Sequence, residues 1–190
     1  MTVDVDPRRA ELHALLTERA FLFGDFVLAS GRRSDYFFDA KQVTLDGRGL
    51  ALTAALMLER CRALEVTRVA GDDGVGPLLG TIAALSAADG GVPLRALMIR
   101  KAEKQHGTGA TVAGPTPTPG ERAVLVEDVA TTGGSVLRAI EALAPLGVAV
   151  VEVMVIVDRE EGAEAALRGH GLPLHPLFRR RAFGPGSPAA

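Results

Sequence analysis

VLVEDVATTGGS, residues 124–135, joins a run of apolar residues to two adjacent carboxylates and then to small and hydroxylated residues. Val124 to Val126 are typical of a buried parallel strand, which is covered on both faces. Carboxylates are costly to bury unless they are paired or bound, so Glu127 and Asp128 indicate a ligand. The small residues that follow let a ligand approach the backbone, and free amides at a helix start attract anions. The stretch therefore offers acceptors for hydroxyl groups beside a cradle for a phosphate, which is what a sugar phosphate requires.

Strand-like and helix-like segments alternate on both sides of this stretch. The expected strands are 66–71, 94–100, 122–127, 148–158 and a last strand or edge at 172–178, and the expected helices are 7–19, 47–64, 76–88, 135–146 and 160–169. Such alternation predicts an α/β fold with a central, mostly parallel sheet, flanking helices and right-handed crossovers.

The remaining segments complete one expected domain that spans residues 1–190. Short apolar and aromatic runs with turn residues between them predict a small N-terminal hood over about residues 20–45. Residues 101–120 have no apolar period and are rich in Gly, Thr and Pro, so we expect a mobile loop there. The end of the chain, GPGSPAA at 184–190, reads as a loose tail.

Composition excludes several classes of protein. The chain has 190 residues, of which 47% are hydrophobic, enough for one sizeable core. Its net charge of −2 gives no global basic field for nucleic acid. Cys61 is the only cysteine, and its helical surroundings suggest a buried, inert thiol. The N-terminus is not a signal peptide and no apolar run is long enough for a membrane span, so we expect a cytoplasmic protein.

Four polar clusters fall at the carboxyl ends of expected strands, where ligands bind in open α/β sheets. They are residues 71–77, 100–109, 127–135 and 158–160. The chain lacks the GxxxxGK[ST] motif of P-loop proteins and the GxGxxG spacing of dinucleotide sites. It also lacks a GxSxG serine and metal-ligand spacing of its histidines. We therefore expect one crevice built from four distant segments.

EDVATTGGS, residues 127–135, resembles the ribose-5-phosphate signature of the type I phosphoribosyltransferases, which use phosphoribosyl pyrophosphate (PRPP). The resemblance implies the type I phosphoribosyltransferase fold. It also implies that Glu127 and Asp128 bind the ribose hydroxyls. The residues implied in holding the 5-phosphate are Val129, Ala130, Thr131, Thr132, Gly133, Gly134 and Ser135.

RKAEKQHGTG, residues 100–109, places four cationic or titratable side chains on a glycine-containing loop. A mobile cationic loop can open for a polyanion and close over it. The pattern R-K-x-x-K-x-H-G resembles the catalytic loop of orotate phosphoribosyltransferases. The resemblance implies that Arg100, Lys101, Lys104 and His106 bind PRPP and neutralise its leaving pyrophosphate, with Lys104 or His106 delivering a proton.

Two further segments support the same family. SGRRSDYFFD, residues 30–39, resembles the segment that covers the orotate ring, and it implies Phe37 and Phe38 as orotate-binding residues, together with Thr131. VIVDRE places Arg159 just past a strand end, where a guanidinium can pair with the carboxylate that distinguishes orotate from uracil.

Two positions depart from the family pattern. Ala29 stands where many members have a lysine before SGR, and the 71–77 loop has Asp72 and Asp73 where some carry Tyr-Lys. We assign neither aspartate a firm role, and we expect pyrophosphate contacts there to come from backbone amides or from Mg²⁺.

The resemblance implies an enzyme that joins orotate to PRPP with Mg²⁺, giving orotidine 5′-monophosphate and pyrophosphate. It further implies a homodimer with shared active sites and no nucleic-acid or membrane partner. Three alternatives stay open: a phosphoribosyltransferase for another base, a non-catalytic regulator that binds PRPP or a nucleobase, and a different sugar-phosphate enzyme of the α/β class.

Overall fold

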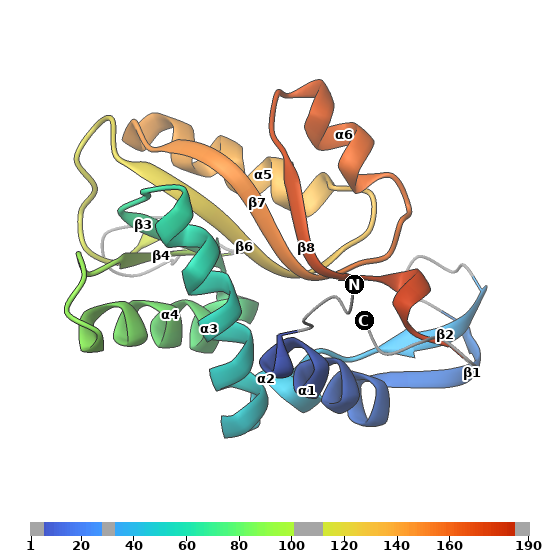
Figure 1. Cartoon of the computed structure of the whole chain (residues 1–190). Coiled ribbons are helices and arrows are strands. Elements are labelled where there is room, and N and C mark those ends of the chain that lie inside the picture. The colour runs from blue at the N-terminus through green and yellow to red at the C-terminus, as the bar shows by residue number, and fades with distance from the viewer. Residues whose placement is uncertain (1–5, 28–32, 101–111, 185–190) are drawn as a thin grey trace, which may run out of the picture.

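The computed structural model describes residues 6–27, 33–100 and 112–184. Its centre is a six-stranded sheet with the strand order β5-β4-β3-β6-β7-β8, and β1 and β2 form a separate two-stranded sheet (Figure 1). The strands are β1 (Phe21–Val27), β2 (Arg33–Phe38), β3 (Arg68–Asp72), β4 (Arg95–Ile99), β5 (Val112–Ala113), β6 (Arg122–Ala130), β7 (Ala149–Asp158) and β8 (Leu174–Arg179). Only the β4–β5 pairing in the large sheet is antiparallel.

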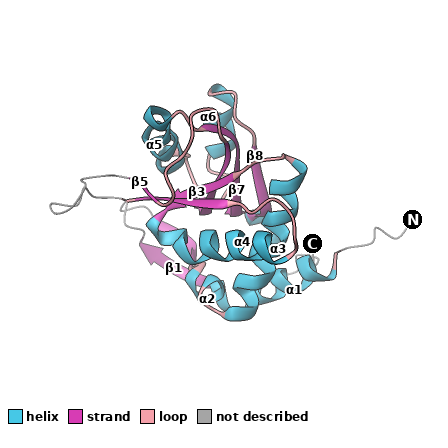
Figure 2. Cartoon of the chain, turned by 90° about the vertical axis from the view of Figure 1, so that its left-hand side faces the viewer, coloured by secondary structure: helices cyan, strands magenta, loops and turns pink. Residues whose placement is uncertain are grey.

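Helices cover both faces of this sheet, as Figure 2 shows. They are α1 (Pro7–Leu15), α2 (Lys41–Thr44), α3 (Gly47–Ala63), α4 (Gly76–Ala88), α5 (Gly134–Leu143) and α6 (Ala163–Gly169). Successive residues of β6 point to opposite faces. Val124 and Val126 belong to the core that includes α3 and α4, whereas Ala123 and Leu125 belong to the core that includes α5 and α6. The predicted α/β class, with a central mostly parallel sheet, is therefore confirmed.

Local sequence signals begin the N-terminal helices. The Asp6 carboxylate accepts a hydrogen bond of 2.9 Å from the Arg8 amide, and Pro7 occupies the first turn, where its missing N–H costs nothing. Asp46 caps α3 in the same way through the amides of Arg48 and Gly49. α3 carries Cys61, which is buried, and burial raises the pKa of its thiol to about 12. The predicted burial of this thiol is confirmed.

The β1–β2 hairpin lies beside the C-terminal end of the described chain. The Phe21 ring stacks on Phe183 with centroids 4.2 Å apart, and Phe21 also contacts Phe38 at 4.6 Å. The short 3₁₀ turn η4 (Arg180–Ala182) follows β8 and brings Arg180 to the same aromatic group. A contact between the two ends of the chain thus fixes the hairpin against the sheet (Figure 1).

Several boundaries differ from those predicted. α1 ends at Leu15, and a π-helical turn, Leu16–Ala20, completes the expected 7–19 helix. The segment 112–120, expected to be loop, contains β5, because Val112 and Ala113 pair with the edge of β4. β6 continues to Ala130, beyond its expected end at Glu127, so Asp128 also lies inside the strand. Within the ranges that the model describes, no helix combines the length and the apolar character that crossing a membrane requires.

Candidate active site

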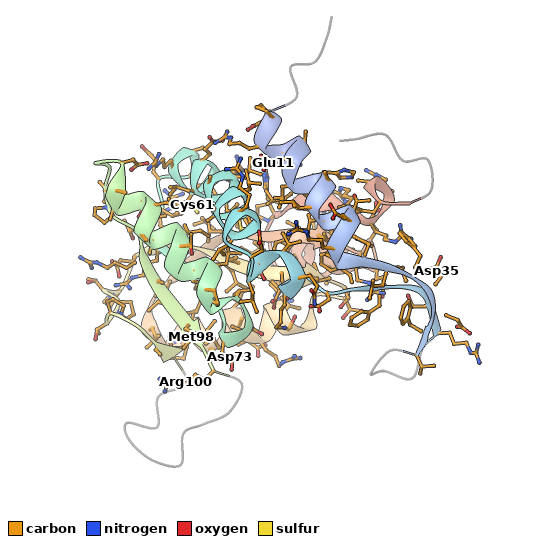
Figure 3. All side chains as sticks on the ribbon, turned by 90° about the horizontal axis from the view of Figure 1, so that it is seen from below. Glu11, Asp35, Cys61, Asp73, Met98 and Arg100 are labelled. Carbon is orange, nitrogen blue, oxygen red and sulfur yellow. The ribbon has the colours of Figure 1, made fainter. Side chains whose placement is uncertain are left out.

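The carboxyl ends of β3, β4, β6 and β7 meet at one edge of the sheet. Asp72 at the end of β3 is in register with Ile99 at the end of β4, and Ala130 of β6 is in register with Asp158 of β7. Figure 3 shows Asp73 and Arg100 close to one another at this edge. The predicted convergence of distant segments on one edge is therefore present.

Glu127 and Asp128 lie near the carboxyl end of β6, and each is only partly exposed. Burial, together with the neighbouring negative charges of Asp128 and Asp72, raises the pKa of Glu127 to about 8. The Asp128 amide donates to Glu127 Oε1 at 3.2 Å, and the Val129 amide donates to Asp128 Oδ1 at 2.8 Å. A site that concentrates negative charge in this way favours ligands that bring hydroxyl donors or a cation.

The residues after β6 form a tight turn into α5. Gly133 has φ +88°, a left-handed conformation that favours glycine, and a Cβ placed there would meet Ala166 Cβ at 3.4 Å. Thr132 and Ser135 are exposed, while the Thr131 carbonyl accepts a hydrogen bond of 3.0 Å from the Ala163 amide. The turn therefore presents hydroxyls and the first amides of α5 to solvent, next to the two acids.

The end of β3 approaches β6 closely at Gly71. A Cβ at Gly71 would meet the Val126 carbonyl oxygen at 2.5 Å, so no larger side chain fits there. Asp72 follows Gly71 in the 71–77 loop. Its carboxylate accepts a hydrogen bond of 2.8 Å from the Gly74 amide. Its charge also raises the pKa of Glu127. Asp72 therefore affects the ionisation of Glu127, and the sequence alone does not predict this effect.

A cavity of about 640 Å³ opens at this edge, and its lining includes Asp72, Arg100, Ser135 and Arg138. Arg138 folds back over the start of α5. Its Nη1 lies 3.7 Å from the position that a Cβ on Gly134 would take. Arg100 thus lies beside the turn, as predicted. Lys101, Lys104 and His106, the other members of the cationic loop, lie outside the described residues.

Arg159 follows β7 and lies on the hairpin side of the edge. Its amide donates to the Ala130 carbonyl at 2.9 Å, which ties it to the end of β6. Its guanidinium pairs with Glu161 at 2.9 Å and lies 4.8 Å from the centre of the Tyr36 ring. The Arg159 Nε is buried and has no hydrogen-bond partner within the described part of the chain. An anion that reaches this nitrogen would satisfy it.

The three aromatic residues of β2 alternate between the faces of the hairpin. Tyr36 is buried, whereas Phe37 is 43% exposed and packs against Phe26 with centroids 5.9 Å apart. Phe38 is partly buried and packs on Phe21. Phe37 and Phe38 point to opposite faces of the hairpin. A flat base that packs on one face would therefore contact one of these two side chains.

The sequence motifs do not predict the contacts of two side chains at the site. Glu161 contacts Arg159, and the guanidinium of Arg180 lies 4.2 Å from the centre of the Tyr36 ring. The run of three arginines at 179–181 is the only hint of the second contact, and a surface position is the ordinary expectation for it. These contacts depend on how distant segments pack.

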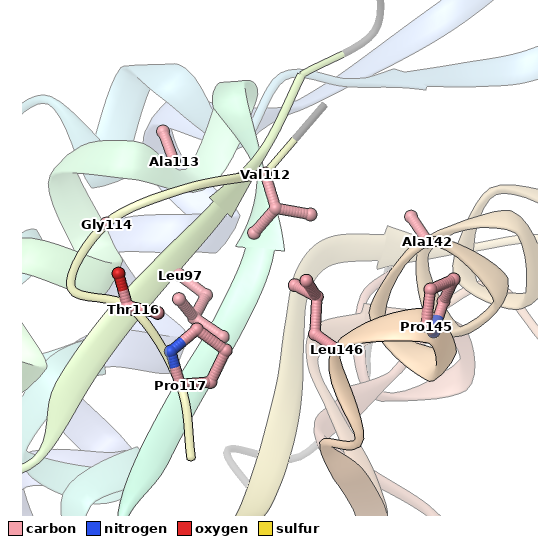
Figure 4. Close-up of a pocket in the computed structure, with 9 residues that line it drawn as sticks. All are labelled: Leu97, Val112, Ala113, Gly114, Thr116, Pro117, Ala142, Pro145 and Leu146. Carbon is pink, nitrogen blue, oxygen red and sulfur yellow. The ribbon is translucent and has the colours of Figure 1, made fainter. Parts of the chain in front are cut away.

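A separate cavity of about 320 Å³ lies between β4, β5 and the end of α5 (Figure 4). Its lining includes Leu97, Val112, Pro117 and Leu146, and none of the described residues that line it is charged. Such a lining does not suit a phosphate or a carboxylate.

Mg²⁺ binds through one or two carboxylates, several waters and the phosphates of a substrate. No group of three or more His, Cys, Asp or Glu residues could hold a metal within the described ranges. The carboxylates of Asp72, Glu127 and Asp128 nevertheless share one electrostatic site, which raises the pKa of Glu127. These residues fit a cation that is held mainly by the phosphate oxygens of a ligand and by water.

Comparison with known proteins agrees with this geometry. A family model described as a phosphoribosyl transferase domain matches residues 73–168. The orotate phosphoribosyltransferase of Rhodopseudomonas palustris (strain TIE-1) is 42% identical over 92% of this chain and 95% of that protein. The orotate phosphoribosyltransferase of Sorangium cellulosum is 44% identical, with 95% of each chain covered.

Solved structures give the same result. Orotate phosphoribosyltransferase of Mycobacterium tuberculosis, in complex with Fe(III) dicitrate, superposes with a TM-score of 0.78 at 34% identity, covering 92% of this chain and 97% of that one. The same enzyme in complex with PRPP gives 0.73 at 32% identity, with 91% and 96% covered. The chain therefore belongs to the phosphoribosyltransferase family and, within it, to the orotate phosphoribosyltransferases.

Proposed function

We propose that this chain transfers the 5-phosphoribosyl group of PRPP to orotate, a step of pyrimidine nucleotide synthesis. Orotate N1 gives up its proton to water and forms a bond to C1 of the ribose while the C1–oxygen bond to pyrophosphate breaks. The products are orotidine 5′-monophosphate and pyrophosphate, which leaves with the bonding electrons. The observation that carries the proposal is the position of Arg159, whose amide is bonded to Ala130 at the end of the strand that holds Glu127 and Asp128.

The ribose 5-phosphate of PRPP would occupy the turn after β6. Glu127 and Asp128 accept hydrogen bonds from the ribose hydroxyls, and both lie where β6 meets this turn. The backbone and side chains of 129–135 hold the phosphate, helped by the positive end of the α5 dipole.

Orotate would lie between Arg159 and the β1–β2 hairpin. A guanidinium suits a carboxylate because its planar donors match two oxygens, and the buried Nε of Arg159 is available for one of them. Phe37 and Phe38 would supply apolar contact to the ring, and Thr131 a polar contact at its edge.

Catalysis would come from positioning and charge stabilisation rather than from a covalent nucleophile. The transition state has oxocarbenium character, and negative charge builds on the leaving pyrophosphate. Arg100 lies at this edge, and Lys101, Lys104 and His106 follow it in the sequence. These side chains would neutralise the pyrophosphate, Lys104 or His106 would deliver a proton, and closure of the segment that carries them would exclude water. Bound Mg²⁺ would supply further neutralisation of the PRPP oxygens.

We also propose that residues 1–190 form one cytoplasmic domain that pairs as a homodimer with shared sites. A symmetric pair is the commonest oligomer, and the cations that follow Arg100 in the sequence would find a polyanion in the neighbouring subunit's site. Mixing Lys104→Ala with Asp128→Asn tests this arrangement. In a shared-site dimer, one site of each mixed dimer is intact, so activity returns to about a quarter of wild type after random exchange. No recovery after demonstrated exchange would assign each loop to its own chain.

A phosphoribosyltransferase for another base is the nearest alternative, and Arg159 argues against it because purine bases carry no carboxylate. The deciding experiment measures turnover of orotate, adenine and hypoxanthine by absorbance, with PRPP and Mg²⁺. We expect turnover of orotate alone. Turnover of a purine in place of orotate would overturn the proposal.

A further inference from the structure

The side chain of Arg159 has an incomplete set of partners. Its Nη2 lies 2.9 Å from Glu161 Oε1, and its Nε is buried with no acceptor among the described residues. Only 12% of the Arg159 side chain is exposed, so its charge depends on Glu161 for compensation while the base site is empty.

The backbone that carries the pair is fixed on both sides. The Arg159 amide donates to the Ala130 carbonyl at 2.9 Å and the Ala163 amide to the Thr131 carbonyl at 3.0 Å. Between them, the Glu160 amide donates to Asp158 Oδ1 at 2.9 Å. A ligand that changes the pairing of Arg159 must therefore do so by moving side chains. Glu161, with 21% of its side chain exposed, can turn to water without leaving a buried charge.

We propose that Glu161 is a resident carboxylate that compensates Arg159 in the empty site and is displaced by the carboxylate of the pyrimidine. The inference rests on the proposed function and deepens it. The incoming carboxylate takes both donors of the guanidinium edge, including Nε, and so forms a better aligned pair than Glu161. When the product leaves, Glu161 returns to Arg159, so the guanidinium is never left buried and unpaired. Glu161 thereby weakens product retention.

The test compares two nucleotides that differ only in the carboxylate, orotidine 5′-monophosphate and uridine 5′-monophosphate. Their dissociation constants are measured by calorimetry on the full chain, for the wild type and Glu161→Gln. We expect the variant to bind orotidine 5′-monophosphate about two- to fivefold more tightly, which is the range of a partly exposed ion pair. Binding of uridine 5′-monophosphate should not change. Glu161→Ala should act in the same direction.

Two controls separate competition from a general charge effect. Glu160→Gln removes the neighbouring carboxylate, which pairs with Arg181 at 3.1 Å, and it should leave both affinities unchanged. In an Arg159→Met background, Glu161→Gln should give no gain, because the competed cation is absent.

Weaker or unchanged binding of orotidine 5′-monophosphate by Glu161→Gln would overturn the inference, since Glu161 would then orient Arg159 or be idle. Equal tightening of both nucleotides would also overturn it. A wild-type chain that binds neither nucleotide would overturn the proposed function itself.

Discussion

The proposed ribose–phosphate side of the site comes from one continuous stretch, 127–135, whereas the proposed base side combines β2, the 159–163 turn and η4. The first side relies on short side chains, backbone amides and the left-handed Gly133. The second relies on long side chains that meet at Tyr36, where both Arg159 and Arg180 lie. A single substitution should therefore change base recognition without changing the phosphate cradle, and the reverse should also hold.

The largest expected effect is on the base side. Arg159→Ala removes a charge-assisted pair with the orotate carboxylate, which is worth about 1.5–3 kcal/mol, so the Michaelis constant for orotate should rise by roughly ten- to a hundredfold. The constant for PRPP should change far less. Steady-state kinetics with each substrate varied in turn measures both, and equal effects on the two substrates would rule out the assigned role.

On the cradle side, Asp128→Asn keeps the shape of the side chain but removes its charge. Binding or turnover of PRPP should fall by at least about tenfold, or 1.4 kcal/mol, because the ribose hydroxyls lose a charged acceptor. The orotate site should be preserved. Thermal unfolding checks that the variant is folded, and unchanged PRPP kinetics in a folded variant would remove Asp128 from the cradle.

The raised pKa of Glu127 makes the cradle sensitive to pH. The folded carboxyl has a pKa of about 8 against an ordinary value of 4.5, so between these values the folded state binds a proton that the unfolded state releases. The free energy of unfolding should therefore fall as pH rises from 4.5 to 8 and then level off, by up to about 1.4 kcal/mol per pH unit. The difference between wild type and Glu127→Gln, measured by denaturant unfolding, isolates this contribution. A difference that does not vary with pH would contradict it.

Binding of PRPP should show the same titration with the opposite sign. Ribose hydroxyls and Mg²⁺ favour the charged form of Glu127, so PRPP affinity should increase as pH rises toward 8 and binding near neutrality should release a proton. Calorimetry in buffers of different ionisation enthalpy counts that proton. In Glu127→Gln, the release that is due to this residue should disappear, while the smaller titration of the PRPP phosphates remains as the internal control.

The smallest expected effect concerns Gly133. Gly133 and Gly120 share φ +88°, but Gly120 has open space around its Cβ position and lies outside the cradle. Alanine at either position should cost about 1 kcal/mol of stability through backbone strain. Only Gly133→Ala should also weaken PRPP binding, by a few fold, because it shifts the amides at the start of α5. Equal kinetic effects of the two variants would show that the turn geometry is unimportant.

The continuous side of the site was the more predictable one. The strand, the acids and the glycine turn are neighbours in sequence, so their order alone places them together, and only the end of β6 extends beyond its expected limit. The contact of Arg159 with Glu161 depends on the backbone at Glu160, which has φ +60°, an unusual value for a residue other than glycine. The contact of Arg180 with Tyr36 needs the packing of the chain's two ends. β5 was missed because two residues are too few to form a pattern.

Cys61 gives the chain an internal reporter of its own opening. It is the only thiol, it is 0% exposed within α3, and its pKa of about 12 keeps it unreactive. A thiol reagent can label it only when the packing around α3 opens, so the labelling rate measures the free energy of that opening. Cys61 belongs to the core on one face of the sheet, whereas α5, which follows the turn, belongs to the core on the other face. PRPP should therefore slow labelling only if the opening that exposes Cys61 also disrupts the turn. The experiment would show whether the helix layers on the two faces of the sheet open together or separately.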